Sequence, residues 1–123
     1  MPEIKRELDS ELCKAIMLWT ENWLGRDLTT PFDLEGYTPQ NIFYNTRRLF
    51  NVNLILVSRP QKVDRNMVGY WPVGITPHGR NFIKAAQDEK RWAKAVAAFR
   101  EHNETNRSET LKPLLGVLFA GGT

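Results

Sequence analysis

The chain has 123 residues, of which 41% are hydrophobic, and it contains four Trp, three Tyr and six Phe. This size and composition suit one compact domain with a real core and exclude wholesale disorder. Its formal charge of +3 is mild, and its single cysteine, Cys13, excludes an internal disulfide and a cysteine-rich zinc site. A single cysteine fits a reducing compartment. The first residues lack a leader pattern, and the apolar run 114–120 is far shorter than a membrane span, so we expect a cytoplasmic protein.

The first predicted element is an amphipathic helix over residues 3–24. Its apolar residues recur at spacings of three and four, which marks one face for burial. They are Ile4, Leu8, Leu12, Ala15, Ile16, Trp19 and Trp23. Gly25 follows as a C-terminal stop. Alternation between Leu28 and Leu34 then predicts a short strand, which Pro31 confines to a sheet edge.

Thr38 followed by Pro39 predicts the start of a helix over residues 39–51. At 100° per residue, this helix has one apolar side and one polar side. The side predicted to be buried holds Ile42, Thr46, Leu49 and Phe50, with Phe43 on its border. The opposite side presents Gln40, Asn41, Tyr44, Arg47 and Arg48. This polar side has two arginines and no acid, whereas an ordinary solvated helix face would favour mixed charges.

Residues 54–73 predict a β-hairpin, with strands at 54–57 and 67–73 and a basic loop tip at 59–66. Thr76 and Pro77 then open a helical region, 77–87 and 88–103, which forms either two helices or one bent helix. A polar linker over 103–110 and an apolar tail complete the chain. We therefore expect a domain at 1–103 and, at 104–123, a tail that either folds back on the core or joins a second copy.

This order of elements predicts an α+β fold: a helix-dominated winged helix with a small antiparallel β-hairpin wing and extra C-terminal helices. The commonest task of that fold is to place one helix in a DNA groove. Arginine pairs with guanine and phosphates, and glutamine and asparagine pair with adenine. The polar side of helix 39–51 therefore predicts base and phosphate contacts.

The charge distribution agrees with such a surface. Residues 38–66 have a net charge of +4, which leaves −1 for the rest of the chain; the charged residues in this segment are Arg47, Arg48, Arg59, Lys62 and Arg65 against Asp64. In the loop, Arg59, Lys62 and Arg65 would hold phosphates. The alternative is a charged hairpin turn that keeps a sheet edge soluble.

Signs of catalysis are weak. His78 and His102 are the two histidines, and neither has a second ligand at metal-binding spacing. The sequence has no G-x-S-x-G motif and no P-loop. We expect no enzymatic activity, no metal and no cofactor.

Two segments resemble a known family. They are 36–55, which begins Gly-Tyr-Thr-Pro-Gln-Asn, and 75–92, which begins Ile-Thr-Pro-His-Gly-Arg. Together they resemble the bacterial and prophage family DUF2513, over about residues 4–96. The resemblance implies a winged-helix-like domain. Asn45 and Arg80 stand where the family has histidine, and Asn53 where it has glycine, so roles tied to those histidines do not carry over.

We therefore expect a regulator of transcription or of a mobile element that binds double-stranded DNA, with a homodimer through the C-terminal helices. The alternative is a non-enzymatic adaptor, such as a phage-type inhibitor of a host defence or nucleic-acid enzyme. In that case Tyr44, Arg47 and Trp71 would anchor a protein partner. Fold alone does not decide between these functions.

Overall fold

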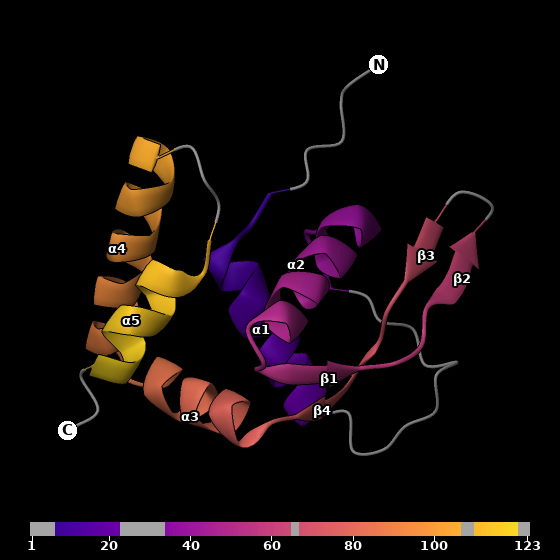
Figure 1. Ribbon diagram of the computed structural model, residues 1–123, viewed down its shortest axis with the longest axis horizontal. Coiled ribbons are helices and arrows are strands. Elements are labelled where there is room, and N and C mark those ends of the chain that lie inside the picture. The colour runs from indigo at the N-terminus through magenta and orange to yellow at the C-terminus, as the bar shows by residue number, and fades with distance from the viewer. Residues whose placement is uncertain (1–6, 23–33, 65–66, 107–109, 121–123) are drawn as a thin grey trace.

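The computed structural model describes residues 7–22, 34–64, 67–106 and 110–120. In chain order its elements are α1 (Ser10–Glu21), α2 (Pro39–Asn51), β1 (Ile55–Val57), β2 (Gln61–Asp64), β3 (Met67–Gly69), β4 (Pro72–Ile75), α3 (Pro77–Ala86), α4 (Glu89–Asn106) and α5 (Lys112–Ala120). The strands form two short antiparallel pairs beside a set of helices (Figure 1). This arrangement confirms the predicted helix-rich α+β class.

Helix α1 begins later than predicted, because Asp9 caps it. Asp9 has an extended backbone, and its carboxylate accepts hydrogen bonds from the amides of Glu11 and Leu12. Residues 7–9 are therefore not helical. The expected features at Trp23, Gly25 and 28–33 lie outside the described residues; Leu34, the last residue of the predicted strand, is not in a strand.

Helix α2 has the predicted bounds. The hydroxyl of Thr38 accepts a hydrogen bond from the amide of Asn41, and Pro39 occupies the first turn. The helix ends at Asn51, after which Asn53 adopts a left-handed conformation with φ of 64°. Glycine and asparagine are the residues that enter this region most readily. The backbone thus explains why asparagine can replace the glycine expected at this turn.

The predicted hairpin over 54–73 is present, with more strand than expected. β1 pairs antiparallel with β4, placing Ile55 opposite Ile75, and β2 pairs antiparallel with β3, placing Lys62 opposite Val68. Between the two pairs, the Ser58 amide donates to the Trp71 carbonyl at 2.8 Å. The expected loop 59–66 therefore contains β2, and the expected strand 67–73 is divided into β3 and β4.

Helices α3 and α4 are separate, which decides between the two alternatives for this region. The carboxylate of Asp88 accepts hydrogen bonds from the amides of Lys90 and Arg91, so it caps α4. Helix α4 continues to Asn106, and the expected linker at 103–110 is therefore helical at its start. Residues 107–109 lie outside the described part of the chain.

The apolar tail folds back on its own chain. Helix α5 packs against α3 and α4, and Leu114 and Leu118 are fully buried. They join a core that also draws residues from α1 to α4, including Leu12, Ile16, Ile42, Leu49, Phe82, Trp92 and Phe99. The most apolar part of the tail is thus used within the monomer.

Candidate nucleic-acid interface

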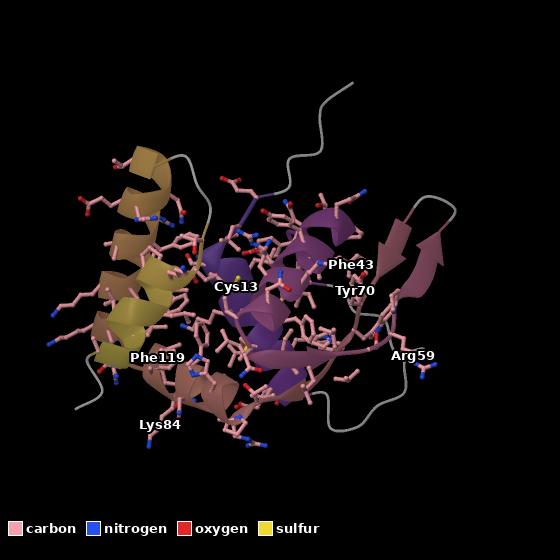
Figure 2. All side chains as sticks on the ribbon, viewed as in Figure 1. Cys13, Phe43, Arg59, Tyr70, Lys84 and Phe119 are labelled. Carbon is pink, nitrogen blue, oxygen red and sulfur yellow. The ribbon has the colours of Figure 1, made fainter. Side chains whose placement is uncertain are left out.

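Helix α2 and the returning half of the hairpin are held together by an aromatic contact. The rings of Phe43 and Trp71 lie 6.0 Å apart between centroids, tilted by 43°. The Phe43 ring also lies against the backbone of Gly69, where a Cβ would come within 2.6 Å of Phe43 Cε1. A larger residue at position 69 would push the ring away. Figure 2 shows Phe43 in the space between α2 and the hairpin, close to Tyr70.

One turn further along α2, Arg47 makes a second connection to the hairpin. Its Nη1 donates a hydrogen bond of 3.0 Å to the hydroxyl of Tyr70. The guanidinium carbon also lies 5.7 Å from the centre of the Tyr70 ring, within cation–π range. Arg47 is nevertheless exposed. The contact therefore orients an exposed cation at the boundary between helix and hairpin.

The polar side of α2 is only partly available to a partner. Arg47 is exposed, whereas Gln40, Tyr44 and Arg48 are half-buried. The Arg48 guanidinium lies 5.8 Å from the centre of the Tyr44 ring. We call the exposed Arg47, together with the half-buried Gln40 and Tyr44, the α2 face.

The sequence assigned the two phenylalanines of α2 wrongly. Phe50, predicted to be buried, is 45% exposed, whereas Phe43, predicted to lie at the border, is only 8% exposed. The reason is the position of the hairpin, which covers Phe43 with Trp71 and Gly69. Helical periodicity alone does not show which side of a helix a neighbouring element packs against.

Asn41, predicted to contact bases, also makes a contact within the chain. Its Oδ1 accepts a hydrogen bond of 3.1 Å from the amide of Glu7. The segment before α1 therefore lies along this edge of α2. The base contact assigned to Asn41 stays a prediction, since its oxygen has a second lone pair and its Nδ2 remains a donor.

Asn45 is a structural centre that the sequence analysis missed. It is fully buried, and its Oδ1 accepts from the Asp9 amide at 2.9 Å and from the Cys13 thiol at 3.4 Å. Its Nδ2 donates to the carbonyls of Glu7 and Asn41. Asn45 thereby ties residues 7–9 to α2. The resemblance marked the position as a departure, which was the one signal that it is special.

The charges around α2 are divided between its two edges. Burial raises the pKa of the Cys13 thiol, the charge of Asp9 raises it further, and the charge of Arg48 lowers it. The pKa of the Tyr37 phenol is likewise raised by burial and by Asp9 and Glu11. Both acids and Arg48 therefore lie toward the edge of α2 that contacts α1, and Arg47 lies toward the hairpin.

A family comparison covers this region. The family model of DUF2513, described as a hypothetical protein, matches residues 7–105. The chain belongs to DUF2513. Searches of curated proteins and of solved structures returned no match. The DUF2513 match extends from the segment before α1 almost to the end of α4, so it includes the α2 face and the whole hairpin.

Three cations of this DUF2513 chain were predicted to hold phosphates from the hairpin, and the structure describes the positions of two of them. Arg59 is exposed after β1 and points away from the helices (Figure 2). Lys62 lies on β2, paired with Val68 of β3. Arg65 lies outside the described residues. Figure 2 places Arg59 on the same side of the picture as Phe43 and Tyr70.

The described part of the DUF2513 chain was also compared with the requirements of a metal site and of a membrane-spanning helix. Within the described ranges, no group of three or more His, Cys, Asp and Glu is arranged to hold a metal ion. None of the helices described is both long and apolar enough to cross a membrane.

Proposed function

We propose that this chain is a cytoplasmic winged-helix protein that binds double-stranded DNA and regulates transcription or a mobile element. The observation that carries the proposal is the link between Arg47 and Tyr70, which joins α2 to the hairpin while leaving the arginine exposed. A helix with an adjoining hairpin is the arrangement in which a winged helix meets DNA.

In this proposal, α2 enters the major groove. A helix with side chains is about 10–12 Å across, and the major groove is about 12 Å wide. The α2 face would make the base contacts, with Arg47 paired to guanine and Gln40 to adenine. Tyr44 would donate a hydrogen bond to a phosphate or a base.

The remaining cations would hold the phosphate backbone. Arg48 lies at the edge of the α2 face, and Arg59 lies at the root of the hairpin. Lys62 and Arg65 are given the same role from the sequence. Contacts of this kind supply affinity for any DNA sequence and make binding depend on salt.

The proposed homodimer would use outward-facing parts of α4 and α5, since Leu114 and Leu118 are already buried. Two copies related by a twofold axis would match two half-sites on DNA. The molar mass in solution, measured by light scattering with and without duplex DNA, tests this part of the proposal.

DNA binding is tested by titrating the purified chain with a random duplex at salt concentrations between about 50 and 200 mM. Several phosphate contacts predict a loss of affinity of orders of magnitude over this range. Arg47→Gln should weaken binding, and Arg59→Gln, which removes a phosphate contact, should weaken it and reduce the salt dependence by about one counterion. The matched control is Lys94→Gln, which removes an exposed cation from α4 and should bind DNA like the wild type.

A second candidate function is supported by exposed apolar side chains. Phe50 of α2 is 45% exposed and Leu56 of β1 is 53% exposed. Side chains of this size on a surface suit a protein partner. In an adaptor, Tyr44, Arg47 and Trp71 would be the anchors, although Trp71 already packs on Phe43.

The two functions give different results in two experiments. The adaptor would be favoured if DNA binding is absent or independent of salt. It would also require a stoichiometric protein partner whose binding is lost in Phe50→Ser and Leu56→Ser. Salt-dependent DNA binding that survives both serine variants and is weakened by Arg47→Gln would favour the regulator.

A further inference from the structure

A polar cavity lies at the junction of α3, α4 and α5. It has a volume of about 260 Å³ and is lined by Asn81, Lys84, Ala85, Arg91 and Phe119. Figure 2 shows Lys84 and Phe119 at the end of the molecule opposite Phe43 and Tyr70. The cavity is therefore separate from the α2 face.

The charged residues that line the cavity are cations. Lys84 and Arg91 contribute two positive charges, Asn81 contributes an amide, and no carboxylate is among the lining residues. The nearest carboxylates in sequence are those of Asp88 and Glu89; Asp88 accepts hydrogen bonds from the amides of Lys90 and Arg91, and Glu89 is exposed. The cavity thus has the charge expected of a site for an anion.

The guanidinium of Arg91 has an unused donor. Its Nε is buried and has no hydrogen-bond partner among the described residues. Buried donors in proteins are nearly always paired, because an unpaired one loses its hydration without compensation. Because this donor is closed to solvent, a ligand in the cavity reaches it only if the Arg91 side chain moves.

The other wall of the cavity is aromatic. The Phe119 ring stacks on the His78 ring, with centroids 4.7 Å apart and planes inclined by 30°. This contact fixes Phe119 beside Ala85, which also lines the cavity. The volume is slightly below the range of about 300–1,000 Å³ for pockets that hold drug-sized ligands. A small molecule fits it best.

We propose that this cavity binds a small phosphate monoester whose phosphate meets Lys84 and Arg91 and whose apolar or planar group lies on Phe119. Phosphate oxygens accept readily from guanidinium groups, and lysine acts as a point charge toward phosphate. The proposal does not depend on DNA binding, since it uses different residues at the other end of the molecule.

The test is a nuclear magnetic resonance titration of the full chain with phenyl phosphate at constant ionic strength. Phenol and inorganic phosphate serve as probes of the two halves of the ligand. We expect saturable shifts at the amides of Asn81, Lys84, Ala85 and Phe119, with phenyl phosphate binding more tightly than either half. Shifts that are absent, unsaturable or confined to the α2 face would overturn the proposal.

Variants test the roles of the two cations. Lys84→Gln should weaken phenyl phosphate binding by about tenfold or more, as expected for a hydrogen bond to a charged group. Arg91→Gln removes the guanidinium and its charge and should also weaken binding. The control Lys94→Gln alters an exposed cation of α4 outside the cavity and should bind like the wild type.

Lys84 is exposed, so its replacement should leave the fold intact, as circular dichroism can verify. Lys84→Gln therefore decides the matter even if the Arg91 variant does not fold. Equal affinity in Lys84→Gln and the wild type would refute the site. DNA affinity, measured in parallel, should be unchanged by Lys84→Gln, so failure of this site and failure of DNA binding are separate results.

Discussion

Gly79, in the first turn of α3, lies directly against the backbone carbonyl of Leu54. A Cβ on Gly79 would overlap the Leu54 carbonyl oxygen and would come within 2.9 Å of Ile75 Cγ2. The same Leu54 carbonyl accepts a hydrogen bond from the amide of Thr76. This close approach sets how α3 leaves the hairpin.

Replacing Gly79 by alanine should therefore destabilise the protein. We expect a loss of about 1–3 kcal/mol in the free energy of unfolding, since backbone at Leu54 must shift to admit the methyl group. Gly116 of α5 is the matched control, because nothing lies within 4 Å of a Cβ placed there. Gly116→Ala should stabilise by about 0.5–1 kcal/mol through helix propensity. Urea unfolding of both variants measures the difference, and equal stabilities would contradict the close packing at Gly79.

Asn45→Ala should destabilise the protein by roughly 3 kcal/mol, because buried polar groups of the segment before α1 lose their partners. Those groups are the Asp9 amide and the Glu7 carbonyl. Asn51→Ala, an exposed position on the same helix, should change stability by no more than about 0.5 kcal/mol. Thermal unfolding compares the two. Similar melting temperatures would mean that Asn45 does not hold residues 7–9 in place.

Cys13 should be unreactive in the folded protein. Its thiol is buried, and burial raises its pKa, so little thiolate is present to attack an alkylating reagent. At pH 8 we expect labelling to be about 10³-fold slower than in denaturant, because it requires unfolding. Mass spectrometry of iodoacetamide-treated protein measures this. Rapid labelling without denaturant would show that the thiol is accessible.

The raised pKa of Cys13 also gives stability a pH dependence. The folded state holds the thiol proton more tightly than the unfolded state, whose thiol has a pKa of about 8.5. The contribution to stability is therefore complete below about pH 8.5 and falls as pH rises, by up to about 1.4 kcal/mol per unit. Cys13→Ala lacks this contribution. The stability difference between wild type and variant should shrink between pH 8 and 10, and a constant difference would contradict the linkage.

Tyr70→Phe tests whether the hairpin orients Arg47 for DNA. The variant keeps the ring and loses the hydroxyl that accepts from Arg47. We expect DNA affinity to fall by roughly tenfold or less, with an unchanged salt dependence, because the cation remains but is less well oriented. Arg47→Gln should lower affinity further, because the guanine contact is lost altogether. A Tyr70→Phe variant with wild-type affinity would show that this hydrogen bond has no part in binding.

Some elements were predictable because their signals are local. Thr38-Pro39 and Thr76-Pro77 each combine a capping hydroxyl with a proline suited to the first turn, and both helices start there. The start of α1 was predicted too early, since its periodicity extends across the capping residue Asp9. Periodicity finds an amphipathic segment, but a cap decides where the helix begins.

The candidate site was less predictable than the elements that carry it. Arg47 is exposed as predicted, whereas the contact of Asn41 with the amide of Glu7 was not foreseen. Tyr70 was not assigned at all, because 23 residues separate it from Arg47. The cationic cavity was also missed, since Lys84, Arg91 and Phe119 come from three helices.

The sequence by itself determined the family, the helix-rich α+β class and the extent of α2, because caps, turns and periodicity act over a few residues. Only the tertiary structure decided that Phe43 is buried while Phe50 is exposed, that Asn45 binds the segment before α1, and that the tail docks on α3 and α4. These outcomes depend on which distant surfaces meet. That choice is made by the total burial and hydrogen bonding of the whole chain, and no local pattern encodes it.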